Sequence, residues 1–117
     1  MIRSRFYYCA PEGSLHMEVR GHAGWGPKGK DPVCGAVSSL VCTLGEAVER
    51  MYHQSMLRRC PRVVLEPGRA EIIAVPKASA LREALIVFWF AELGLCGLAE
   101  GFPGNVIVEE TMTVDAG

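Results

Sequence analysis

Two short β-prone runs open the chain, at residues 2–8 and 15–21, with a turn composition of Ala, Pro, Glu and Gly between them. Such runs on either side of turn-forming residues predict two strands joined as a hairpin. A second pair of runs, residues 62–65 and 70–75, flanks the segment Glu66-Pro67-Gly68-Arg69. Pro-Gly suits the centre of a type II turn, so we expect a second hairpin there.

Two longer segments carry apolar residues at helical spacing. The first opens at Asp31-Pro32 and is expected to run to about Met56, because Asp can accept the free amide hydrogens of a first helical turn and Pro is tolerated at the first helical position. Its apolar residues recur every three or four positions: Val37, Leu40, Val41, Leu44, Val48 and Met51. The second helix is expected over residues 79–95, before Gly97. Its apolar stripe, which we interpret mainly as core although part of it could form a dimer contact, comprises Leu81, Leu85, Phe88, Trp89 and Leu93.

A last β-prone run, residues 105–114, completes the element order ββαββαβ. This order predicts an α+β fold with two layers, in which two helices cover a mainly antiparallel five-stranded sheet. At 117 residues, and without a sharp shift in composition, the chain 1–117 is expected to be a single domain.

The composition limits the kinds of partner that we expect the protein to bind. With 12 basic and 13 acidic residues, the formal net charge is −1, so no strong field would gather the phosphates of nucleic acid or lipid. No apolar run of signal-peptide length follows the N-terminus. The most apolar stretch, residues 84–98, is short for a bilayer span and contains Glu92, which favours a buried helix. We therefore expect a cytoplasmic protein that binds neither nucleic acid directly nor a membrane.

Because 50 % of so short a chain is apolar, some apolar area is expected to face a second copy.

The cysteines are odd in number and scattered, without the paired spacing of zinc or thioredoxin sites. They are Cys9, Cys34, Cys42, Cys60 and Cys96. This pattern is typical of a reducing compartment, and we expect no metal and no cofactor. Cys42 lies two helical turns after Cys34, about 12 Å along the helix axis, which is too far for a disulfide. We interpret it as a core residue.

Candidate chemistry lies around a glycine-rich loop between Gly21 and Gly35. Cys34 falls in the first turn of the predicted helix, and His22 lies at the end of the second predicted strand. The amide dipoles at a helix start and a nearby protonated imidazole both favour the nucleophilic thiolate form of cysteine. The backbone N–H groups of Cys34 and Gly35 could stabilise the oxyanion of acyl transfer. If the loop folds back, these groups form a cysteine protease site.

Two further residues could support this site. Asp31 could orient the imidazole or cap the helix, and Ser38 lies one turn beyond Cys34. Spacing alone leaves a plainer interpretation open, in which Cys34 is a small buried hydrophobe and His22 a turn residue.

Residues 21–40 read GHAGWGPKGKDPVCGAVSSL. This run resembles the GHA…GxDxVCxxVS signature of Prp, the ribosomal-processing cysteine protease family. The spacing from His22 to Cys34, the Asp three residues before the Cys and the Ser four residues after it all coincide, although Pro32 stands where the family usually has an aliphatic residue. The similarity is strong over residues 17–42.

The resemblance implies a catalytic dyad of His22 and Cys34 in a small α+β homodimer. It also implies a substrate, the N-terminal extension of large-subunit ribosomal protein number twenty-seven, cut after aromatic residues.

Two other functions remain open from the sequence. The first is a non-catalytic ribosome-assembly module that binds the same peptide, with Cys34 merely packed. The second is nucleotide binding, since residues 24–31 come close to a phosphate-binding loop between a strand and a helix. Asp31 argues against the second, because it stands where such loops need a Ser or Thr for magnesium.

Overall fold

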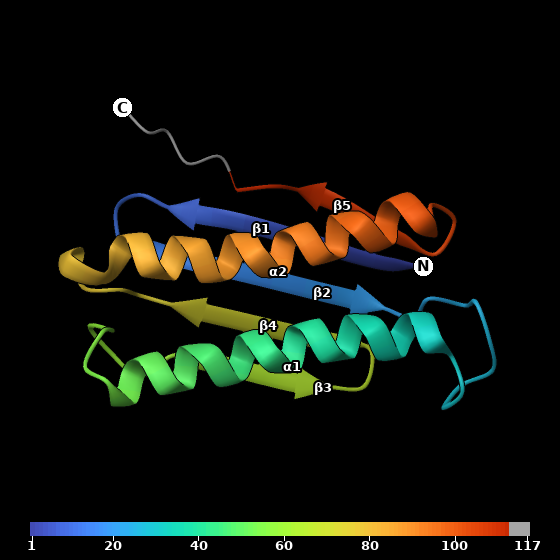
Figure 1. Cartoon of the computed structure of the whole chain (residues 1–117), viewed down its shortest axis with the longest axis horizontal. Coiled ribbons are helices and arrows are strands. Elements are labelled where there is room, and N and C mark those ends of the chain that lie inside the picture. Colours follow the sequence, from blue (N-terminus) through green and yellow to red (C-terminus); the bar gives the residue numbers. More distant parts are fainter. Residues whose placement is uncertain (113–117) are drawn as a thin grey trace.

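One five-stranded sheet carries two helices on the same face in the computed structural model, which describes residues 1–112 (Figure 1). The elements follow in the order β1 (Ile2–Cys9), β2 (Ser14–Gly21), α1 (Pro32–His53), β3 (Arg62–Glu66), β4 (Arg69–Ala74), a 3-10 turn (Ala78–Ala80), α2 (Leu81–Gly101) and β5 (Val106–Glu110). The predicted α+β class and the predicted element order are therefore confirmed.

The strands lie in the order β3-β4-β2-β1-β5. Both predicted hairpins form, β1 with β2 and β3 with β4, and β2 pairs with β4 in the centre of the sheet. All three of these strand pairs are antiparallel. The fifth strand pairs with β1 in parallel. This follows from the connection: the chain leaves β4, crosses the sheet as α2 and returns along the opposite edge, as Figure 1 shows.

The core lies between the sheet and the two helices. Alternate residues of β1 point into it, and Phe6 is fully buried while its neighbour Arg5 is exposed. The other face of the sheet is charged, where Arg5 forms ion pairs with Glu18 and Glu110. Six of the buried α1 residues recur at helical spacing: Val33, Val37, Val41, Leu44, Val48 and Met51.

The first helix starts where the sequence predicts and ends earlier. α1 begins at Pro32 with Asp31 as its N-cap. It ends at His53 rather than at Met56, because Ser55 adopts a positive φ of 60° that no helix can contain. The backbone N–H groups that follow the end of α1 donate to carbonyl groups of its last turn.

The second helix is longer than predicted. α2 continues through Gly97 to Gly101, because a glycine inside a helix costs only about 1 kcal/mol relative to alanine. Leu95 is buried and Leu98 packs against the core, so tertiary contacts hold this last part in place. The strand that follows α2, β5, ends at Glu110. The predicted strand end at Val114 lies outside the described residues.

Residues Ala78–Gly101 form a helix that is long and apolar enough to cross a membrane, by length and composition alone. The helix exceeds the stretch 84–98, so length no longer argues against a span. Core helices meet the same criterion, however, and the inner side of α2 lies in the core through Ala84, Phe88 and Leu95.

Only part of the predicted apolar stripe on α2 is core. Phe88 is fully buried, whereas Trp89 and Leu93 are 53 % and 47 % exposed. The prediction that Trp89 belongs to the core is therefore wrong, because only one side of the helix faces the sheet. We call the four exposed apolar residues Ile86, Trp89, Phe90 and Leu93 the outer face of α2.

Candidate active site

A single carboxylate joins the glycine-rich loop to the start of α1. One oxygen of Asp31 accepts the backbone N–H groups of Val33 and Cys34, at 2.9 and 3.3 Å. Its other oxygen accepts those of Trp25 and Gly26, at 2.9 and 3.0 Å. The Asp31 side chain therefore caps the helix and folds the loop back onto it at the same time.

These amides also determine the charge of Asp31. Desolvation raises the pKa of the Asp31 carboxyl, but its four backbone hydrogen bonds outweigh this effect, so the pKa lies below its ordinary value. The ionised carboxylate occupies the loop amides of Trp25 and Gly26, which a phosphate would otherwise use. This arrangement disfavours the nucleotide-binding interpretation of residues 24–31.

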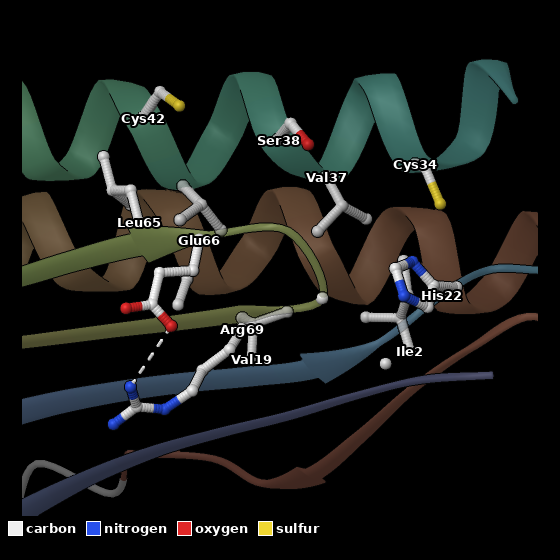
Figure 2. A pocket seen from close by; sticks show the side chains of 14 residues that line it. Ile2, Val19, His22, Cys34, Val37, Ser38, Cys42, Leu65, Glu66 and Arg69 are labelled. Atoms are coloured by element: carbon white, nitrogen blue, oxygen red, sulfur yellow. Dashed lines mark ion pairs between the residues drawn. The ribbon is translucent and has the colours of Figure 1, made fainter. Parts of the chain in front are cut away.

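Cys34 and His22 line the same pocket, which has a volume of about 280 Å³. Cys34 projects from the first turn of α1 toward the ring of His22, which follows the end of β2 (Figure 2). The thiol is half-buried and the imidazole is exposed, so a substrate in the pocket can reach both. Among the described residues, no hydrogen bond joins the two side chains; the Cys34 sulfur accepts the backbone N–H of Ala23 instead, at 3.2 Å.

The β3–β4 turn packs directly against the imidazole. Gly68 has a positive φ of 74°, and a Cβ atom on it would lie 2.9 Å from Nε2 of His22. The carbonyl of Gly68 accepts the N–H of Gly21, at 2.9 Å, which ties the turn to the residue before His22. Gly21 itself has φ of +99°, and a Cβ there would overlap the carbonyl oxygen of Met1. Both glycines therefore have backbone angles that other residues rarely adopt, and at Gly21 a side chain would also overlap fixed backbone.

The rest of the pocket runs along α1, away from Cys34. Ser38 and Cys42 follow Cys34 at intervals of one turn, and all three line the pocket. Cys42 is exposed, so its interpretation as a core residue is wrong. Figure 2 shows the facing wall, where the β3–β4 hairpin contributes Leu65; the side chains of Glu66 and Arg69, which form an ion pair at 3.6 Å, point away from α1. The pocket is thus a trough between α1 and the hairpin, with apolar side chains such as Val37, Val41 and Leu65 beside the polar groups of α1.

The proposed oxyanion donors are engaged elsewhere. The N–H of Cys34 donates to the Asp31 side chain, and the N–H of Gly35 donates to the Asp31 carbonyl, at 3.0 Å. Neither amide is free in this structure, because both close the first turn of α1. The contact of Gly68 with His22 has no signal in the sequence, because the Pro-Gly pair predicts the turn but not the residue against which the turn packs.

No metal site is found in residues 1–112, since no group of three or more His, Cys, Asp or Glu side chains there could hold an ion. The pocket itself offers a thiol, an imidazole and the hydrogen-bonding groups around them.

The chain matches the family described as cysteine protease Prp over residues 1–107. Similar solved structures include the essential ribosomal processing protease Prp of S. aureus with a covalently linked product peptide, at a TM-score of 0.73 and 20 % identity, covering 95 % of this chain and 100 % of that one. The same enzyme with a substrate peptide has a TM-score of 0.64 at 18 % identity, with coverage of 95 % and 100 %. The SMU.848 protein of Streptococcus mutans has a TM-score of 0.66 at 28 % identity, with coverage of 97 % and 96 %. None of the curated proteins matches. The match over nearly the whole chain shows that this protein belongs to the Prp family and is a cysteine protease.

Proposed function

We propose that this protein is a ribosomal processing protease that removes the N-terminal extension of large-subunit ribosomal protein number twenty-seven, with Cys34 as nucleophile and His22 as base. Family membership supports the protease class, and the S. aureus structures of similar fold hold a substrate peptide and a product peptide. The observation that carries the proposal is that the Cys34 thiol, in the first turn of a capped helix, and the His22 imidazole line the same pocket.

The reaction is acyl transfer. An extended peptide lies in the trough between α1 and the β3–β4 hairpin, and the Cys34 sulfur attacks its carbonyl carbon. The C–N bond then breaks, His22 gives its proton to the leaving amine, and a C–S bond holds the acyl group. Water then gives a proton to His22 and attacks the thioester carbon, the C–S bond breaks, and the acyl group leaves as a carboxylic acid while the sulfur regains the proton. The dipole of α1 and the Ala23 N–H both stabilise negative charge on sulfur before the attack.

The trough suits a peptide with large apolar side chains. Val37, Val41 and Leu65 line its middle, beyond the thiol. Ser38 lies on the same side of α1 and offers a hydroxyl to the bound backbone. The cleavage after aromatic residues that the family resemblance implies is consistent with this lining.

The active form is proposed to be a cytoplasmic homodimer that pairs through the outer face of α2. Exposed side chains as large as Trp89 and Phe90, on one helix face, are typical of a surface that another molecule covers. Sedimentation at micromolar concentration tests this proposal. A monomer would contradict it, and so would a protein that is recovered only with lipid vesicles.

The test of the catalytic proposal uses the host's ribosomal protein as substrate. The wild type is expected to cut its N-terminal extension, whereas Cys34→Ser and His22→Ala leave it intact. Cys42→Ser is the matched control, because it removes a second thiol from the same pocket and should cut normally. Unchanged cleavage by Cys34→Ser would remove the proposed nucleophile. Wild-type protein that binds the extension without cutting it would favour the peptide-binding module.

A further inference from the structure

One side chain from the far edge of the sheet reaches the loop beside the proposed nucleophile. The Nδ2 group of Asn105, just before β5, donates a hydrogen bond to the carbonyl of Ala23, at 2.8 Å. The backbone N–H of the same Ala23 donates to the Cys34 sulfur, at 3.2 Å. A chain of two hydrogen bonds therefore runs from Asn105 through Ala23 to Cys34.

Asn105 is itself held firmly. Its backbone N–H donates to the carbonyl of Phe102, at 2.9 Å, and its carbonyl accepts the N–H of Ile2, at 2.8 Å. The residue is thus anchored to the end of α2 on one side and to β1 on the other. An amide side chain on such a support can fix whatever it binds.

The loop needs that support, because it has little of its own at this point. Ala23 lies close to Gly21 and Gly24, whose φ angles are +99° and +69°, and glycine restricts the backbone less than any other residue. The Ala23 side chain is buried, at 2 % exposure, so its peptide groups depend on protein partners rather than on water. Asn105 supplies the partner for the carbonyl.

We propose that Asn105 is a positioning residue of the active site. By holding the Ala23 carbonyl, it aims the Ala23 N–H at the Cys34 sulfur and keeps the adjacent His22 at the mouth of the pocket. It acts through Ala23 and touches neither the thiol nor the peptide. The role rests on the proposed function, since it matters only if the Cys34 sulfur is the nucleophile.

The replacements Asn105→Ala and Asn105→Asp test the role. Both remove the N–H donor, and an ionised Asp also sets a negative charge against the Ala23 carbonyl. Loss of one such hydrogen bond is expected to lower kcat about 10-fold, with KM little changed, because the substrate trough is not touched. The rate at which iodoacetamide alkylates Cys34 should fall in parallel. The activity of Asn105→Asp relative to wild type should recover as the pH falls toward about 4, where a carboxyl group regains a proton to donate.

Ser4→Ala is the matched control. It removes a different side-chain hydrogen bond at the same edge of the sheet, from the Ser4 hydroxyl of β1 to the carbonyl of Ile107 in β5, at 3.1 Å. Its kcat and alkylation rate should stay at wild-type values, while thermal melting reports any loss of stability in all variants. Wild-type kcat and alkylation in folded Asn105 variants, or an equal loss of both in Ser4→Ala, would overturn the positioning role. If wild-type Cys34 reacts no faster than Cys42, the proposed function itself fails, which is a different result.

Discussion

The two helices cover the same face of the sheet but differ at their ends and on their outer sides. α1 starts with an Asp31 side chain that accepts two amides of its first turn, and Cys34 lies within that turn. The 3-10 turn that leads into α2 has Lys77 at its cap position, without a side-chain hydrogen bond. In contrast, α2 exposes large apolar side chains such as Phe90, which is 73 % exposed.

This difference shows which part of a helix suits which task. A helix start carries the positive end of the dipole, so it can stabilise a thiolate even where, as in α1, a capping side chain accepts its first amides. The exposed side of α2 offers apolar area, which can serve association. α1 is built as the catalytic helix of the proposed enzyme, and α2 as the helix that carries its proposed dimer surface. Four substitutions test this comparison.

Asp31→Ala is expected to have the largest effect. It removes the acceptor of four backbone amides, so the loop with His22 separates from the start of α1. A misplacement of about 1 Å at such a site can lower cleavage about 100-fold, which a peptide assay would measure. Asp31→Asn, which keeps one carbonyl oxygen, should lose less.

The pH dependence of stability sharpens the Asp31 test. Because the folded pKa of Asp31 lies below its ordinary value, its ionised form stabilises the fold above the ordinary carboxyl range, and this contribution is lost as the pH falls through the lowered value. Asp31→Asn should lack that part of the acid dependence in thermal melts between neutral and acidic pH. Melting curves and cleavage rates equal to wild type at every pH would contradict the capping role.

Phe90→Glu tests the other helix. It replaces an exposed apolar side chain on the outer face of α2 by a charge, and loss of about 2 kcal/mol of apolar burial in a dimer corresponds to roughly 30-fold weaker association. Sedimentation would measure the change. Ser39→Glu, at an exposed position of α1, should leave association unchanged. An unaltered dimer in Phe90→Glu would place the interface elsewhere.

Gly68→Ala should act on the site from the hairpin opposite α1. The added Cβ would lie 2.9 Å from Nε2 of His22, at a φ of 74° that alanine rarely adopts. We expect cleavage to fall about 10-fold, through displacement of the imidazole, and stability to fall by about 1 kcal/mol. Gly104→Ala is the control, since a Cβ there meets nothing within 4 Å. Equal activity of the two variants would show that the turn does not hold His22.

The smallest effect is expected from Lys77→Asp, which gives the 3-10 turn before α2 the kind of cap that α1 has. Lys77 has extended backbone angles, φ −62° and ψ 153°, as an N-cap requires. An Asp there should raise the free energy of unfolding by about 0.5–1 kcal/mol in urea denaturation and leave cleavage unchanged. If stability does not rise, the start of α2 is determined by packing rather than by its amides.

Local signals in the sequence were sufficient for much of the site. Asp31-Pro32 predicts the start of α1, and the glycines around His22 predict a loop that can fold back. These features depend on neighbouring residues only, through backbone angles and hydrogen bonds within one turn. The position of Cys34 in the first turn of α1 follows from them, and the structure agrees.

Contacts between distant segments could not be predicted in this way. The sequence pattern alone does not show that Gly68 packs on His22 or that Asn105 binds Ala23, because each pair joins residues from different elements. The exposure of Trp89 likewise depends on which side of α2 meets the sheet. Sequence alone thus determined the elements and the chemical groups of this protein, since local backbone preferences select them. Only the tertiary structure decided what those groups touch, because packing brings together residues that are far apart along the chain.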